Sequence, residues 1–121
     1  MKLRVLVLSL FVAAVGLTIA PIAAPLTKAT TSTTVTVTIG KPTEFHFLLS
    51  KTTVPHGTVV FKLVNKGKIA HDFSISGKTS KKIGPGKSGS LTVALTKGKK
   101  PYKCTVDAHA AAGMKGVLKV T

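Results

Sequence analysis

Three side chains that bind soft metal ions lie close together near the C-terminus of this sequence. Cys104 is the only cysteine, His109 follows it after a short interval, and Met114 follows His109 at the same spacing. Thiolate, imidazole and thioether groups are the side chains that bind copper. The segment joins two strand-like stretches, and a turn of this kind should direct its side chains to one point.

A fourth ligand has to come from elsewhere in the chain. Two histidines, one cysteine and a weak axial methionine form the ligand set of blue-copper electron-transfer sites. His71 is the best candidate for the second histidine, because it lies where a turn leads into a predicted strand. His46 lies between two phenylalanines of another strand, and His56 lies in a turn. We expect both to be ordinary surface or half-buried residues.

Short strands and turns account for the chain from residue 33 onward. Apolar and polar residues alternate over 34–39 and 90–96, which is typical of half-buried strands. The remaining predicted strands are residues 44–49, 58–64, 70–76, 78–83, 101–104 and 116–121, with a basic turn at 97–100. Seven to eight short strands separated by turn residues predict an all-β domain folded as a two-sheet sandwich.

The N-terminal region has the layout of a secretory signal. Lys2 and Arg4 precede an apolar stretch at residues 5–20, and small residues follow it. The stretch is nearly long enough to span a bilayer, so an uncleaved N-terminal anchor is the alternative. We therefore divide the chain into a signal peptide or anchor (1–24), a flexible lead-in (25–32) and one domain (33–121). The protein is expected to be exported, and to be either periplasmic or extracellular and associated with the cell envelope.

A single cysteine in an exported protein has to be protected from oxidation. An exported protein with one cysteine has no internal disulfide, and a free exposed thiol would oxidise there. A thiolate held by a metal inside a pocket would be protected. This favours Cys104 as a ligand.

The charge of the chain is strongly positive, at +15, with 18 Lys and Arg against 3 Asp and Glu. No arginine follows Arg4, Trp is absent and Tyr102 is the only tyrosine, so the groups that read and stack on bases are missing. We therefore expect no nucleic-acid partner. The charge favours an acidic protein partner, an anionic cell wall or a membrane surface, although solubility alone would explain it equally well.

Together these motifs resemble those of the cupredoxins, the small type 1 copper proteins that include plastocyanins and auracyanins. The resemblance extends over about residues 35–121. The matching motifs are Asn65-x-Gly67 before His71-Asp72-Phe73, Gly84-Pro85-Gly86, and Tyr102-x-Cys104 through His109 and Gly113-Met114 to Gly116-x-Leu118-x-Val120.

The resemblance implies a Greek-key β-sandwich with one copper ion near one end. In it, His71, Cys104 and His109 are the equatorial ligands and Met114 is the axial ligand. It also implies a monomeric carrier of single electrons between redox partners, and not an enzyme.

Two features near the candidate ligands depend on how the chain folds: a contact between Asp72 and Thr105, and the backbone conformation at Asp107-Ala108. Asp72 and Thr105 each adjoin a ligand, so a hydrogen bond between them would tie the two ligand segments together. Asp107-Ala108 replaces the Pro-Gly that many relatives have before the histidine. If Ala108 required a positive φ, the cost would be roughly 1 kcal/mol. The Asp107 carboxylate would favour the cupric ion if it were unscreened.

A small apolar patch is expected around His109, formed by the residues that follow it in the loop, Ala110, Ala111, Ala112 and Gly113. Lys68 and Lys115 would flank this patch and attract acidic partners. Other functions remain open from the sequence: a metal-free interaction module, an accessory role in iron uptake, or copper storage and delivery. Delivery proteins often use more open Met- or His-rich sites, and this chain offers only Met114.

Overall fold

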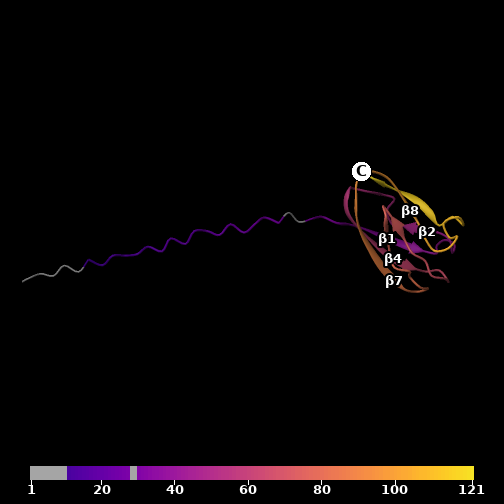
Figure 1. Cartoon of the computed structure of the whole chain (residues 1–121), viewed down its shortest axis with the longest axis horizontal. Coiled ribbons are helices and arrows are strands. Elements are labelled where there is room, and N and C mark those ends of the chain that lie inside the picture. Colours follow the sequence, from indigo (N-terminus) through magenta and orange to yellow (C-terminus); the bar gives the residue numbers. More distant parts are fainter. Residues whose placement is uncertain (1–10, 28–29) are drawn as a thin grey trace, which may run out of the picture.

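The computed structural model describes residues 11–27 and 30–121 (Figure 1). Lys2 and Arg4, on which the signal-peptide prediction partly rests, lie outside the described residues, as do residues 28–29 of the predicted lead-in. Residues 11–27 are exposed and belong to neither a helix nor a strand. Within the described ranges, no helix has the length and apolar character needed to cross a membrane.

Nine strands in the described part of the chain form two sheets, which confirms the predicted all-β sandwich. The four-stranded sheet has the order β2 (Phe47–Leu49), β1 (Thr33–Ile39), β4 (Gly57–Asn65), β7 (Ser88–Leu95). The five-stranded sheet has the order β3 (Thr53–Val54), β9 (Lys115–Val120), β8 (Gly98–Lys103), β5 (Ser74–Ile75), β6 (Lys78–Thr79). The predicted number, seven to eight, was slightly low.

Both sheets are mixed, because the chain crosses between them repeatedly. β1 runs parallel to β4, and β3 runs parallel to β9, whereas the other pairs are antiparallel. Strands that are neighbours in a sheet are therefore often distant in sequence, as β4 and β7 are. This connectivity brings the segment after β4 beside the segment after β8, and these two segments carry the predicted ligands.

The core lies between the two sheets and follows from the alternation of apolar residues. Val35, Val37 and Ile39 of β1 are fully buried, while the threonines between them face outward or are half-buried. Phe73 lies at the centre of an aromatic cluster, with ring centroids 5.0 to 5.4 Å from those of Phe47, Phe61 and Tyr102. Cys104 and Met114 belong to the same buried cluster. The predicted metal site is thus an extension of the core.

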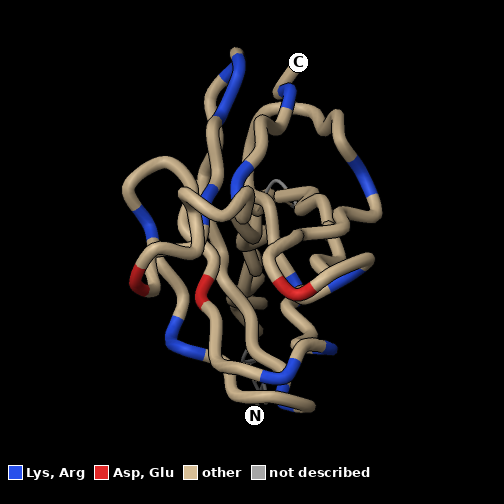
Figure 2. Tube along the Cα trace, turned by 90° about the vertical axis from the view of Figure 1, so that its right-hand side faces the viewer, with Lys and Arg blue, Asp and Glu red and all other residues tan. Residues whose placement is uncertain are grey.

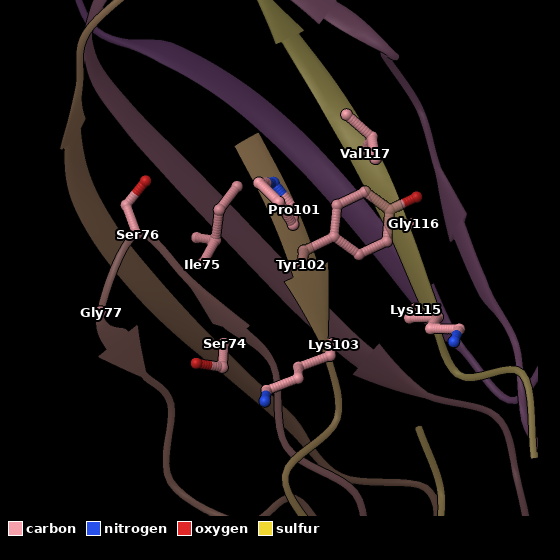
Figure 3. A pocket seen from close by; sticks show the side chains of 10 residues that line it. All are labelled: Ser74, Ile75, Ser76, Gly77, Pro101, Tyr102, Lys103, Lys115, Gly116 and Val117. Carbon is pink, nitrogen blue, oxygen red and sulfur yellow. The ribbon is translucent and has the colours of Figure 1, made fainter. Parts of the chain in front are cut away.

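Tyr102 packs closely across the β8–β9 pair. Gly116 is its direct partner in the register, and a Cβ atom at Gly116 would overlap the tyrosine ring. Figure 3 shows the ring lying over this position, between Val117 and Lys115. The glycine is therefore required by the close approach of the ring.

Four predicted elements differ in the structure, and the first is the predicted strand at 78–83, of which only β6 forms. The predicted strand at 70–76 is reduced to β5, because residues 71–73 are all buried and do not alternate. His71 instead forms an isolated bridge with Ile83. The predicted strand at 44–49 begins only at Phe47, since a turn over residues 44 and 45 carries Glu44 toward His71.

The predicted turn at 97–100 is wrong. β8 already begins at Gly98, which pairs with Val120 of β9. Lysines are poor strand formers, but pairing with a neighbouring strand overrides this weak preference. β3 was not predicted, because two residues are too few to show a periodic pattern.

Candidate metal centre

Three donor atoms of the predicted ligands converge on one point. Nδ1 of His71 lies 3.1 Å from Nδ1 of His109, and Sγ of Cys104 lies 4.0 Å and 3.6 Å from these two nitrogens. A point equidistant from three atoms so separated is about 2.1 Å from each, which matches first-row metal bonds to nitrogen and sulfur of ~2.0 to 2.3 Å. The three side chains are therefore spaced to bind one ion.

Two separate segments supply these atoms. His71 follows β4 and is fixed by backbone hydrogen bonds to Ile83 in both directions. Cys104 follows β8 directly, and Met114 comes directly before β9. The Cys104 amide donates to the Met114 carbonyl at 3.0 Å, and the Met114 amide donates to the His109 carbonyl at 3.1 Å. The ends of the loop are thus held together by the β8–β9 pairing.

All four predicted ligands are buried, and only His109 keeps a small exposed part. His71 and Met114 are fully buried, Cys104 is 1% exposed and His109 is 9% exposed. His109 Nε2 has no hydrogen-bond partner in the protein, and no buried side-chain nitrogen or oxygen of the described residues lacks one. This edge of the His109 ring therefore reaches solvent.

The backbone before His109 shows that Ala108 is not strained. The positive φ falls on Asp107, at 41°, and not on Ala108. Aspartate tolerates the left-handed region far better than alanine does, because its short polar side chain can hydrogen-bond locally. The expected cost at Ala108 is therefore absent. The Asp107 side chain is exposed, so water screens its charge from the site.

The predicted contact between Asp72 and Thr105 is confirmed. The Thr105 amide donates to Oδ1 of Asp72 at 2.6 Å, and the Thr105 hydroxyl donates to Oδ2. Asp72 is 4% exposed, so this pair of hydrogen bonds is protected from water. It joins the residue after His71 to the residue after Cys104.

Glu44 is a residue of this site that sequence reasoning missed. Its Oε1 lies 2.8 Å from Nε2 of His71, and the backbone amides of Lys68 and Ile69 also donate to its carboxylate. The hydrogen bond from His71 is the main cause that holds the pKa of Glu44 below its ordinary value. No motif pointed to Glu44, because it is far from His71 in sequence and lay in a predicted strand. Its rarity was the one available signal, since the chain has 3 acidic residues.

The protonation states suit a soft cation. A carboxylate only accepts hydrogen bonds, so His71 donates from Nε2, and in the tautomer with its proton there the lone pair is at Nδ1. Burial raises the pKa of the Cys104 thiol, so this thiol keeps its proton until a metal displaces it. Two nitrogens and one sulfur in a buried pocket are the donor set of a copper site.

The other histidines are elsewhere, as predicted. His46 is exposed, with its Nδ1 2.5 Å from Oγ1 of Thr43. His56 is also exposed, and its Nδ1 lies 3.0 Å from the Thr121 carbonyl at the C-terminus.

Comparison with known protein families shows to which family this chain belongs. The sequence profile described as copper binding proteins, plastocyanin/azurin family, matches residues 27–121. The chain belongs to this family. The resemblance to cupredoxins inferred from the motifs is thereby confirmed, and the domain is a copper-binding electron carrier and not an enzyme. A search of curated proteins found no significant match.

Solved cupredoxin structures share the fold. Auracyanin B is 21% identical, with 79% of this chain and 93% of that chain covered and a TM-score of 0.63. Rusticyanin from Thiobacillus ferrooxidans is 23% identical, with coverages of 74% and 77% and a TM-score of 0.64. Auracyanin A from Chloroflexus aurantiacus, described as a "blue" copper protein, is 20% identical, with coverages of 75% and 100% and a TM-score of 0.61.

Proposed function

We propose that His71, Cys104, His109 and Met114 hold the copper ion of this cupredoxin. The observation that supports this most directly is the convergence of two imidazole nitrogens and one thiol sulfur within 4.8 Å, from segments far apart in sequence. Met114 would supply the weak fourth ligand, because it is fully buried and its backbone is hydrogen-bonded to that of Cys104. When bound, copper supplies the one-electron redox chemistry.

The protein keeps its ligands in place between the two oxidation states. The Cys104 thiolate would be the strongest ligand, the imidazoles of His71 and His109 would bind with it, and the Met114 thioether would bind weakly and tune the potential. Asp72 and Thr105 tie the two ligand segments together, and the Cys104–Met114 hydrogen bond closes the loop. Since these contacts do not involve the metal, the donors move little when the charge of the ion changes.

His109 is the proposed route for electrons to and from the surface. Its solvent-facing edge is followed in the chain by Ala110, which is half-buried, and by Ala111, Ala112 and Gly113, which are exposed. Small side chains of this kind would let a partner approach the ring closely. They also offer little apolar area, which suits brief contacts between redox partners.

Acidic redox proteins are the proposed partners. Lys68 lies next to the site, because its backbone amide donates hydrogen bonds to Glu44. Lys115 follows Met114 directly. Both side chains belong to exposed residues. Figure 3 shows Lys115 and Lys103 projecting from β9 and β8 at the end of these strands that leads into the ligand loop. Attraction by these lysines would accelerate encounter with an acidic surface.

We also propose that the protein is exported and works as a monomer. The N-terminal stretch is apolar, and its residues 11–27 contribute to neither sheet. Such a segment is suited to act as a removable signal or as an anchor. In either case the copper domain would work outside the cytoplasm, in the periplasm or at the cell envelope, where an anionic wall or membrane surface would attract it.

Redox cycling separates an electron carrier from a copper-delivery protein. The purified domain is loaded with copper and cycled repeatedly between reductant and oxidant, in the presence of a Cu(I) chelator. A carrier should retain its copper through each cycle and transfer one electron per ion. Loss of the copper to the chelator on first reduction would instead indicate delivery.

A further inference from the structure

We propose that Glu44 is a positioning residue of the copper site, which fixes the His71 ring and biases the site toward the oxidised ion. This inference rests on the proposed role of His71 as a ligand. Glu44 itself does not face the three converging donor atoms, since it contacts the opposite edge of the His71 ring, at Nε2.

The carboxylate is held by the backbone independently of His71. The Lys68 amide donates to both of its oxygens, at 3.1 and 2.9 Å, and the Ile69 amide donates to Oε1 at 3.3 Å. The side chain is 26% exposed, so it is partly shielded from water. A carboxylate with these donors has a fixed position, and it can therefore orient the ring that donates to it.

Glu44 determines which nitrogen of His71 is free. Because the Nε2 proton is used in the bond to Glu44, Nδ1 carries the lone pair, and Nδ1 is the atom that faces His109 and Cys104. Metal-bound histidines commonly donate a hydrogen bond from the second ring nitrogen to such a partner, and this hydrogen bond increases the basicity of the ligand. A carboxylate provides a negative charge in addition, which a backbone carbonyl does not.

That charge distinguishes the two oxidation states. A negative charge one imidazole ring away from the ion attracts Cu(II) more strongly than Cu(I), since the attraction is proportional to the charge of the ion. We expect the ratio of Cu(II) to Cu(I) affinity to fall about tenfold when the charge is removed. For a one-electron couple this corresponds to a rise of about 59 mV in midpoint potential.

Gly67 keeps the position of the carboxylate open. A Cβ atom at Gly67 would overlap Oε1 of Glu44, which is the end of a flexible side chain. Gly67→Ala should therefore push the carboxylate away without changing the charge of the protein. It complements Glu44→Gln, which keeps an acceptor oxygen for His71 but removes the charge.

The first test uses metal-free protein at neutral pH and needs no copper. Nitrogen-15 NMR of the His71 ring should show a proton on Nε2, with a resonance shifted downfield by the carboxylate. Glu44→Ala and Gly67→Ala should each move this resonance upfield, whereas Glu44→Gln should move it less. A proton on Nδ1 in the native chain, or an unmoved resonance in Glu44→Ala, would overturn the proposal.

The second test measures the midpoint potential of copper-loaded protein. Glu44→Gln should raise it by the shift given above, and Gly67→Ala should raise it in the same direction. Asp107→Asn is the matched control, because it also removes one carboxylate charge, but from an exposed side chain. It should give less than a third of that shift. No shift in Glu44→Gln, or an equal shift in Asp107→Asn, contradicts the proposal. If the native chain binds no copper, the proposed function fails and the NMR result alone decides the role of Glu44.

Discussion

The thiol of Cys104 must lose its proton before it can bind copper. Burial raises its pKa, so at neutral pH the metal-free protein holds a thiol, and copper uptake releases the proton. Below the thiol pKa, the apparent affinity for copper should rise about tenfold per pH unit. Competition titrations with a chelator between about pH 7 and pH 8.5 measure this slope. An affinity that is constant over this range would contradict the assignment of a buried thiol.

Asp72 should matter to the metal although it does not bind it. Asp72→Ala removes both hydrogen bonds from Thr105, and loss of such a supporting contact typically lowers metal affinity about 10- to 100-fold. We expect weaker copper binding and a shifted potential, measured by chelator competition and voltammetry. Thr105→Ser keeps both donors and is the control, which should resemble the native protein. Unchanged affinity and potential in Asp72→Ala would exclude this role.

Candidate ligands could be named from the sequence where their chemistry is rare in the chain. Cys104 is unique, and Met114 is the only methionine besides Met1, so their spacing around His109 was informative. Glu44 could not be predicted, because its contact with His71 depends on the turn before β2 and on the backbone after β4. Such contacts arise from tertiary structure and leave no local pattern in the sequence.

Among the elements, the β8–β9 pair carries an unfavourable arrangement of charge. Lys99 lies directly opposite Lys119, and Lys103 lies directly opposite Lys115. All four are exposed, and like charges in such positions destabilise a sheet. Lys99→Glu should therefore raise the free energy of unfolding by about 0.2 to 1 kcal/mol, measured by denaturant unfolding at low salt.

Two comparisons make this prediction specific. Lys97→Glu makes the same change of charge at an exposed position outside the strands, so it should stabilise the protein less. High salt should reduce the difference between Lys99→Glu and the native chain, because it screens exposed charges. An equal effect of the two substitutions would show that only net charge matters.

Strands were predictable where alternation continued over several residues, as in β1 and β7. The prediction failed where pairing with a neighbour outweighs local preference. The lysines at the start of β8 suggest a turn, but every residue of β8 is paired in register with a residue of β9. Around His71, burial of three successive residues replaced the expected alternation, because this segment packs between the core and the loop that carries Cys104.

The whole molecule is a cation with its acidic residues outnumbered, 3 against 18. Figure 2 shows the blue lysine positions spread over both ends of the domain, with few red positions among them. Oxidation of the reduced protein by hexacyanoferrate(III), an anion, should therefore slow steeply as salt is added, whereas oxidation by a cationic cobalt complex should not.

Substitution of the lysines near the ligand loop tests whether these residues attract the oxidant to this end of the domain. Replacing Lys68 and Lys115 by glutamine should lower the rate with hexacyanoferrate(III) at low salt more than replacing Lys62 and Lys119, which are exposed positions in β4 and β9. If both pairs have the same effect, net charge alone determines the rate. An unchanged rate in the Lys68/Lys115 variant would refute steering at this end.

Visible absorption during copper addition is the most direct test that one sulfur, two imidazoles and a thioether close around a single ion. We expect an intense thiolate-to-copper band that saturates at one Cu(II) per chain and is absent from Cys104→Ser. His71→Ala should also weaken or abolish the band, because it removes one ligand of the plane. A native protein that stays colourless with Cu(II), or a band that persists in Cys104→Ser, would contradict the account.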